Sequence, residues 1–247
     1  SRLKDKENCS RIRYNKEMRK FLILLLLTIC YLLPTTISAQ SVDLLWQGDT
    51  YVSPFYKGRA LWSSQSRITF LAIPRGLGSP ANLRYKWTKN GTVLGNISGV
   101  GKNSLSFTDS VISRPQIIKV DIVSSQDKVL ASASTLVTPM SPVLVVYENN
   151  PLYGFMFHRE TSGTYPLKER EITFGAFPFF FSITSRADNA ADYQWRTNVG
   201  NAETGNMVTY RTPDDSSGSS QIEVRASNVD KILQDSKKSF LVEFENQ

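Results

Sequence analysis

Residues 68–74 read Ile-Thr-Phe-Leu-Ala-Ile-Pro, and residues 172–178 read Ile-Thr-Phe-Gly-Ala-Phe-Pro. Five of the seven residues are identical at an offset of 104. Other short segments recur in the same order at offsets of 103 to 108, for example Tyr-Lys-Trp at 85–87 and Tyr-Gln-Trp at 193–195. Solenoid repeats are shorter, about 20 to 50 residues. The spacing therefore predicts one whole domain that is used twice.

Both copies alternate apolar and polar residues in short segments. Ile68, Phe70 and Ala72 would share one face of an extended strand, and Tyr85 and Trp87 one face of the next. Turn residues separate the segments, and no segment after residue 39 keeps a helical repeat for three turns. Short strands separated by turns in this way are typical of a β-sandwich. Strands are expected at 42–46, 68–72, 85–87, 105–107, 118–122 and 129–137, and again at 143–147, 172–176, 193–195, 208–210, 222–226 and 232–244.

The pattern Tyr85-x-Trp87-x-x-Asn90-Gly91 resembles strand C of an immunoglobulin-like domain, in which a tryptophan fills the core between the sheets. Residues 193–200 are similar, with one residue inserted. Antibody-type domains have an inter-sheet cysteine pair, which both copies lack. The Tyr-x-Trp and the strand number also resemble polycystic-kidney-disease-like (PKD-like) domains, although their Trp-Asp-Phe-Gly-Asp-Gly run is missing. The resemblance implies tandem bacterial-type sandwiches of the kind that exported surface proteins use for binding and spacing.

These observations predict an all-β chain with two tandem immunoglobulin-like β-sandwiches, at residues 40–138 and 139–247, preceded by an N-terminal hydrophobic leader helix. Residues 1–17 are polar, and translation is expected to start at Met18. The segment after Met18 has the layout of a signal peptide. It contains the basic pair Arg19-Lys20, then an apolar run at 21–33, then small or polar residues up to Ala39. The apolar run has 13 residues, or 17 if counted to Ile37, against about 20 for a membrane span.

A cleaved signal peptide and an uncleaved anchor both remain open. Either way the positive-inside rule predicts that the rest of the chain is exported. Both cysteines, Cys9 and Cys30, fall in the leader, so each sandwich must depend on its apolar core. Residues 1–20 hold eight of the 29 basic and three of the 22 acidic residues, so the rest has a net charge of +2. The overall basicity is therefore not that of a nucleic-acid-binding domain.

Catalytic and metal-binding signals are weak. His158 is the only histidine, which is too few for a zinc site, and it follows no serine motif of a catalytic triad. Residues 188–192 and 214–217 offer oxygen ligands for calcium, but their spacing fits self-satisfied turns better. The sequence predicts no enzyme, no cofactor and no metal site.

Two aromatic stretches are the remaining candidates for a functional surface. Residues 177–181 read Phe-Pro-Phe-Phe-Phe, so at least one ring must face away from its own core, toward the other sandwich, a partner or a lipid surface. A second stretch spans residues 51–62. The candidate partner-contact residues are Tyr51, Phe55, Tyr56, Trp62, Phe179, Phe180 and Phe181.

Three functions remain open. The first is an extracytoplasmic, non-enzymatic surface or envelope protein whose sandwiches bind or space, in adhesion or assembly. The second is a docking subunit of a larger envelope machine such as a pilus or a secretion apparatus. The third is an extracytoplasmic hydrolase that uses carboxylates. A protein or surface polymer is the expected partner, nucleic acid is not, and an uncleaved leader would be the only membrane contact.

Overall fold

The computed structural model describes Met18, Phe21 and residues 39–245, except 168, 199 and 213–216. Most of the predicted leader lies outside the described residues, as do Asp214 and Asp215 of the second candidate calcium loop. Among the described residues, no helix has both the length and the apolar character needed to span a membrane. Residues 40–247 form a unit separate from residues 1–39.

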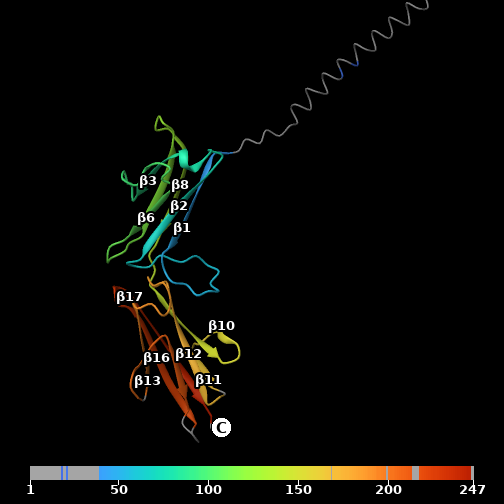
Figure 1. Ribbon diagram of the computed structural model, residues 1–247, viewed down its shortest axis with the longest axis vertical. Coiled ribbons are helices and arrows are strands. Elements are labelled where there is room, and N and C mark those ends of the chain that lie inside the picture. Colours follow the sequence, from blue (N-terminus) through green and yellow to red (C-terminus); the bar gives the residue numbers. More distant parts are fainter. Residues whose placement is uncertain are drawn as a thin grey trace, which may run out of the picture. The chain divides into compact units, whose positions relative to one another are not determined.

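The first eight strands form one sandwich (Figure 1). Strands β1, β2 and β6 make one sheet, and β4, β3, β7 and β8 make the other, with β5 added beside β3. A short 3₁₀ helix, η1 (Pro80–Asn82), leads into β3. The strands are β1 (Ser41–Gly48), β2 (Arg67–Arg75), β3 (Arg84–Lys89), β4 (Thr92–Val93), β5 (Gly99–Val100), β6 (Ser104–Thr108), β7 (Gln116–Val123) and β8 (Val129–Val137).

The remaining strands form the second sandwich. One sheet has the order β10-β9-β12-β15 and the other the order β11-β17-β16-β13-β14, in which β11 and β17 are parallel. The strands are β9 (Val143–Asn150), β10 (Gly154–Glu160), β11 (Thr164–Leu167), β12 (Glu171–Phe179), β13 (Ala191–Thr197), β14 (Glu203–Thr204), β15 (Met207–Arg211), β16 (Gly218–Asn228) and β17 (Lys231–Phe244). The predicted all-β fold with two immunoglobulin-like sandwiches is confirmed, whereas the boundary at residue 138 stays a prediction.

Each sandwich is closed around its Tyr-x-Trp pair. Trp87 and Trp195 are fully buried, and each indole N–H donates to a backbone carbonyl at 2.8 Å, that of Lys102 or of Gly205. The hydroxyls of Tyr85 and Tyr193 likewise donate to the carbonyls of Pro80 (3.1 Å) and Arg186 (3.0 Å). A buried indole or phenol needs such a partner. The two copies therefore repeat the same anchoring contacts.

The repeated heptapeptide forms most of β2 and β12. Its inner face is the same in both copies, whereas its outer face differs. Its inward residues are identical in the two copies, and the phenylalanines among them, Phe70 and Phe174, are fully buried. The only two positions that differ, Leu71 against Gly175 and Ile73 against Phe177, alternate with the inward ones and so lie on the outer face. The inner face thus maintains the fold, and the outer face distinguishes the sandwiches.

Candidate functional site

The structure brings the two predicted aromatic stretches together, although they are far apart in sequence. Tyr51 and the end of β12 exchange backbone hydrogen bonds: Tyr51 N donates to Phe181 O, and Phe180 N to Tyr51 O, both at 2.8 Å. The ring of Tyr56 meets those of Phe179 and Phe180 edge-on, each with 5.8 Å between centroids. Phe180 has a φ of 66°, which phenylalanine rarely adopts. The contact between the stretches maintains this backbone.

These rings belong to an apolar cluster on the outer face of the second sandwich's β9–β12 pair. We call it the junction cluster. It is separate from both sandwich cores, and most of its members come from the second sandwich or from the loop between β1 and β2. Its members are Val52, Tyr56, Leu61, Met140, Val145, Tyr147, Phe155, Phe157, Phe177, Phe179 and Phe180.

Strand β10 supplies two of the rings that sequence reasoning missed, and Tyr147 of β9 is another. Phe157 lies 5.2 Å from Tyr147 and 5.3 Å from Phe177, and Phe155 lies 4.9 Å from Phe177, all between centroids. Between its pairings with Asn149 and Tyr147, β10 bulges, so that its aromatic residues fold over the sheet. In the sequence, the alternation of Phe155 and Phe157 is the pattern that could have predicted a strand with both rings on one face.

Gly175 makes this packing feasible. A Cβ atom at this position would lie 2.4 Å from Cε1 of Phe155 and 3.0 Å from NH1 of Arg186. The guanidinium of Arg186 lies over Phe155 (4.6 Å to the centroid) and over Phe177 (4.1 Å). Burial lowers the pKa of Arg186, while Tyr51 and Tyr193 act in the opposite direction. Stacking on two rings compensates the partly desolvated cation.

A buried polar network adds a second connection between the sandwiches. The side chain of Gln234 is fully buried, and its amide donates to Ser64 O (2.9 Å) and to the hydroxyls of Ser63 (3.3 Å) and Ser182 (3.2 Å). Its carbonyl oxygen accepts from Ser182 N (2.8 Å) and from the amide of Asn228 (3.0 Å). A satisfied buried network restricts the orientations that two packed surfaces can adopt.

The predicted partner-contact residues separate into buried and exposed ones. Trp62 is fully buried and its indole donates to Ser66 O, so it is a core residue. Phe179, Phe180 and Phe181 are also buried, because the chain itself covers them. These four residues therefore do not form a free surface in this structure. Tyr51 and Tyr56 are half-buried. Phe55 is 71% exposed and lies at the edge of the cluster, with 5.2 Å between its ring centroid and that of Phe157.

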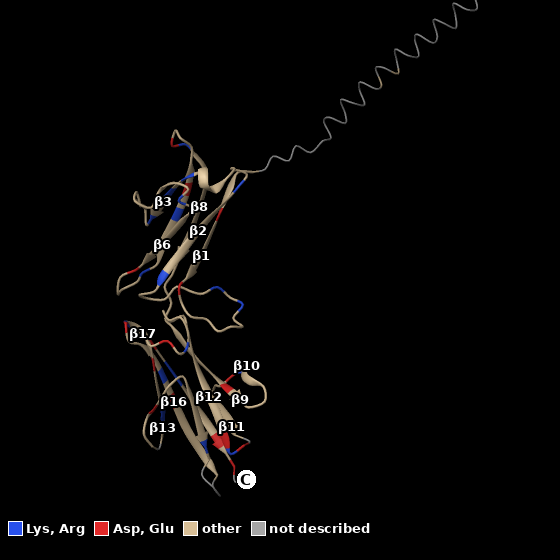
Figure 2. Cartoon of the chain, viewed as in Figure 1, with Lys and Arg blue, Asp and Glu red and all other residues tan. Residues whose placement is uncertain are grey.

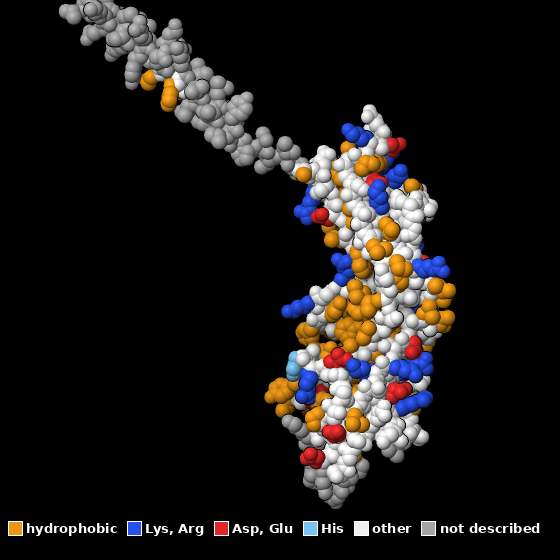
Figure 3. Space-filling view, turned by 180° about the vertical axis from the view of Figure 1, so that it is seen from behind, with side chains coloured by type: hydrophobic (Ala, Val, Ile, Leu, Met, Phe, Trp, Pro, Cys, Tyr) orange, Lys and Arg blue, Asp and Glu red, His pale blue; other side chains and the backbone are white. Residues whose placement is uncertain are grey.

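The turn between β9 and β10 carries the most exposed apolar side chains of this region. Leu152 is 85% exposed and Tyr153 is 77% exposed. The turn is ordered, because the side-chain oxygen of Asn150 accepts from the N–H groups of both residues (3.0 and 3.3 Å). Figure 3 shows hydrophobic side chains gathered on the face of the molecule that it presents. Leu152 and Tyr153 are therefore candidates for a contact surface.

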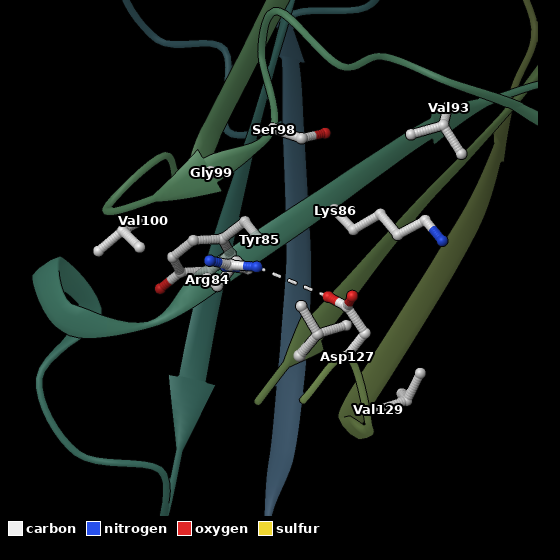
Figure 4. Close-up of a pocket in the computed structure, with 10 residues that line it drawn as sticks. Arg84, Tyr85, Lys86, Val93, Ser98, Gly99, Val100, Asp127 and Val129 are labelled. Atoms are coloured by element: carbon white, nitrogen blue, oxygen red, sulfur yellow. Dashed lines mark ion pairs between the residues drawn. The ribbon is translucent and has the colours of Figure 1, made fainter. Parts of the chain in front are cut away.

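A shallow groove of about 460 Å³ lies on the first sandwich, between β3, β5 and the β7–β8 turn (Figure 4). Arg84 reaches across it toward Asp127, with 3.6 Å between the charged atoms. Valines form much of its rim, and Asp127 is the only carboxylate among the residues that line it. The groove therefore lacks the facing carboxylate pair that glycoside hydrolysis needs.

A polar pocket of about 350 Å³ lies on the second sandwich. The hydroxyl of Tyr165 donates to Glu148, and Arg159 donates to that hydroxyl at 2.8 Å. Burial, followed by the hydrogen bond to Glu148, raises the pKa of Tyr165 to about 12. The phenol thus stays neutral at physiological pH, and the three groups satisfy one another.

The candidate calcium loop at 188–192 forms a turn. The carboxylate of Asp188 accepts from the backbone N–H groups of Thr184 (2.8 Å) and Ala190 (3.0 Å), and from the Thr184 hydroxyl. These hydrogen bonds lower the pKa of Asp188. Among the described residues, no group of three or more His, Cys, Asp or Glu side chains has the arrangement of a metal site. His158 is exposed.

No protein-family model and no curated protein sequence matches the chain. Similar solved structures include three N-terminal domains of the bacteriophage RB49 highly immunogenic outer capsid protein, with 17% identity over 83% of this chain and 59% of that one and a TM-score of 0.42. The fibronectin(III)-like modules of Clostridium thermocellum CbhA share 14% identity over 82% of this chain and 95% of that one, with a TM-score of 0.26. The mouse nectin-like molecule 4 ectodomain shares 10% identity over 85% of this chain and 65% of that one, with a TM-score of 0.28. The chain thus spans under two thirds of the first structure. Similarities this low carry no argument about function.

Proposed function

We propose that residues 40–247 are a non-enzymatic binding and spacer module of an exported surface or envelope protein. The ordered, exposed Leu152–Tyr153 turn carries this proposal, because it combines an apolar surface with a fixed backbone. A preorganised turn loses little conformational freedom when it binds, so more of the gain from apolar burial remains as affinity. The partner is a protein or a surface polymer.

The polar groups of the chain support binding over catalysis. The most distinctive ones are used internally: Asp188 holds its own turn, and Glu148 and Arg159 both hydrogen-bond with Tyr165. Figure 2 shows that Lys and Arg positions alternate with Asp and Glu positions along the described strands, and a nucleic-acid-binding surface instead gathers basic residues on one face. Because no cysteine follows residue 30, the folding of the two sandwiches does not depend on disulfide bonds.

A docking subunit of a larger envelope machine is the second candidate, and the Gln234 network favours it. Such a subunit must present its surfaces in a fixed relation, and a buried hub bonded to both sandwiches provides that. In both functions the apolar turn is the contact element, and an uncleaved leader would be the only membrane contact.

The test is site-specific photo-crosslinking in cells that produce the whole chain. A photoreactive residue replaces Tyr153 in one variant and Ile112 in the control, since Ile112 is 71% exposed but lies in a loop of the first sandwich. We expect a discrete crosslinked species from position 153 only, and protease added outside intact cells should degrade the chain. Equal crosslinking at both positions, or a chain that protease reaches neither outside intact cells nor after the outer envelope layer has been permeabilised, would contradict the proposal.

A further inference from the structure

The internal repeat extends to the loop that joins the sandwiches. After β1 the chain carries Pro54-Phe55-Tyr56, and after β9 it carries Pro151-Leu152-Tyr153. In the first sandwich this element contacts the second: Tyr56 packs on Phe179 and Phe180, and Phe55 on Phe157. In the second sandwich the equivalent element is uncovered. One copy of the element therefore has an immunoglobulin-like sandwich as its partner, and the other has none within the described residues.

The receiving face is repeated as well. Tyr147 pairs with Gly175, and Val145 with Phe177, on the outer face that carries the junction cluster. The same register in the first sandwich pairs Leu45 with Leu71, and Asp43 with Ile73. Leu45 is 49% and Leu71 is 40% exposed, and they lie directly opposite each other. The first sandwich thus has an uncovered apolar patch at the position where the second is covered.

We propose that the Leu152–Tyr153 turn of one copy docks on the Leu45–Leu71–Ile73 face of a second copy of this chain, with Tyr153 at Arg75, the counterpart of the Phe179 that Tyr56 contacts in the internal junction. The inference rests on the proposed function, because it takes this turn as the binding element. Each copy carries one free turn and one free face, so the contact is heterologous and repeats from copy to copy.

The chemistry of the two surfaces is compatible. Leu152 would add an aliphatic side chain to an aliphatic patch, and Tyr153 would meet Arg75, the residue equivalent to Phe179. The Arg75 side chain is 68% exposed and is held by Asp43 at 2.6 Å, so its guanidinium can stack on a phenol ring. A net charge of +2 after residue 20 leaves little repulsion between copies.

The experiment is sedimentation velocity on residues 40–247, a unit that contains both sandwich cores and the junction cluster. The wild type is compared, from micromolar to millimolar concentration, with Leu152→Asp (turn variant), Leu71→Asp (face variant) and Ile112→Asp (control). We expect the wild type and the control to form oligomers that grow with concentration, and each of the other two to stay monomeric. An equimolar mixture of the turn and face variants should give one-to-one pairs and nothing larger, because it restores a single intact interface.

Three results would overturn the inference: a wild type that is monomeric at millimolar concentration, a wild-type dimer that Leu71→Asp leaves intact, or variants that do not pair when mixed. Circular dichroism and thermal unfolding check each fold, and Tyr153→Ser with Leu45→Ser replaces any aspartate variant that unfolds. A monomeric wild type together with positive crosslinking at residue 153 would reject self-association and leave the proposed binding function standing.

Discussion

Replacing Gln234 by leucine tests whether the buried network fixes the two sandwiches to each other. Leucine has a similar volume but provides no hydrogen bonds, so the substitution removes the polar contacts and largely keeps the packing. Gln234 belongs to β17 of the second sandwich, whereas Ser63 and Ser64, which accept from its amide, belong to the first. The substitution therefore acts on the second sandwich and on the junction at once.

The magnitude follows from the partners that are left behind. Ser182 N loses an acceptor at 2.8 Å, and Ser64 O loses a donor at 2.9 Å. A fully buried polar group left without its partner costs roughly 1–3 kcal/mol, and since Ser182 and Ser64 are half-buried, the two groups together cost about 2–3 kcal/mol. Asn228 retains a hydrogen bond to Ser182 O and adds little. We expect a loss of about 3 kcal/mol, a large part of the roughly 5–15 kcal/mol that stabilises a domain.

Urea unfolding of residues 40–247, followed by tryptophan fluorescence, measures this loss. Gln194→Leu is the matched control, since Gln194 is half-buried and its side chain bonds only to Asp192 of its own strand, at 3.3 Å. We expect the control to stay within about 0.5 kcal/mol of the wild type. If Gln234→Leu costs less than about 1 kcal/mol, or no more than the control, the network does not fix the junction.

Three further predictions follow from the cores and the junction cluster. Trp87→Ala and Trp195→Ala should each cost about 3–5 kcal/mol in urea unfolding, and a cost under about 1 kcal/mol would place that indole outside the core. Gly175→Ala should cost about 1–3 kcal/mol through overlap with a ring 2.4 Å away. Leu71→Ala, at the equivalent exposed position, should cost less, and the reverse order of the melting temperatures would contradict the packing. Because the fold favours the neutral form of Tyr165, the stability that Tyr165 contributes should be complete below pH 10 and lost as the pH rises toward 12; Tyr165→Phe should reduce this pH dependence, to which the raised pKa values of Tyr193 and Tyr210 also contribute, and should remove one phenolate absorbance step.

The sandwiches themselves were predictable because strand periodicity and the internal repeat reinforce each other. Ile68, Phe70 and Ala72 alternate with polar or variable residues, and their counterparts at 172–176 do the same. A period-two pattern determines which side chains share a face, and identity in two copies indicates that this face is the core. Every strand expected from the pattern is present.

The junction cluster could be predicted only in part, because tertiary contacts decide which aromatic side chains are covered. Residues 51–62 and 177–181 were recognised as candidates, yet nothing local distinguishes the buried Trp62 from the exposed Phe55. Strand β10 was missed because its residues belong to an irregular, bulged pairing. The hub at Gln234 was missed for the same kind of reason, since its partners lie 52 and about 170 residues away.

The difference between Leu71 and Gly175 means that the outer face of the first sandwich cannot replace that of the second. Leucine at position 175 would collide with Phe155 and Arg186 of the same sandwich, because a Cβ atom there already lies 2.4 Å from the Phe155 ring. Strand β10 would then be displaced from the sheet, and with it Phe157, the ring on which Phe55 of the first sandwich packs. The inward residues of the two heptapeptides are identical, so the residues on the outer face decide that β10 packs on one sandwich and not on the other.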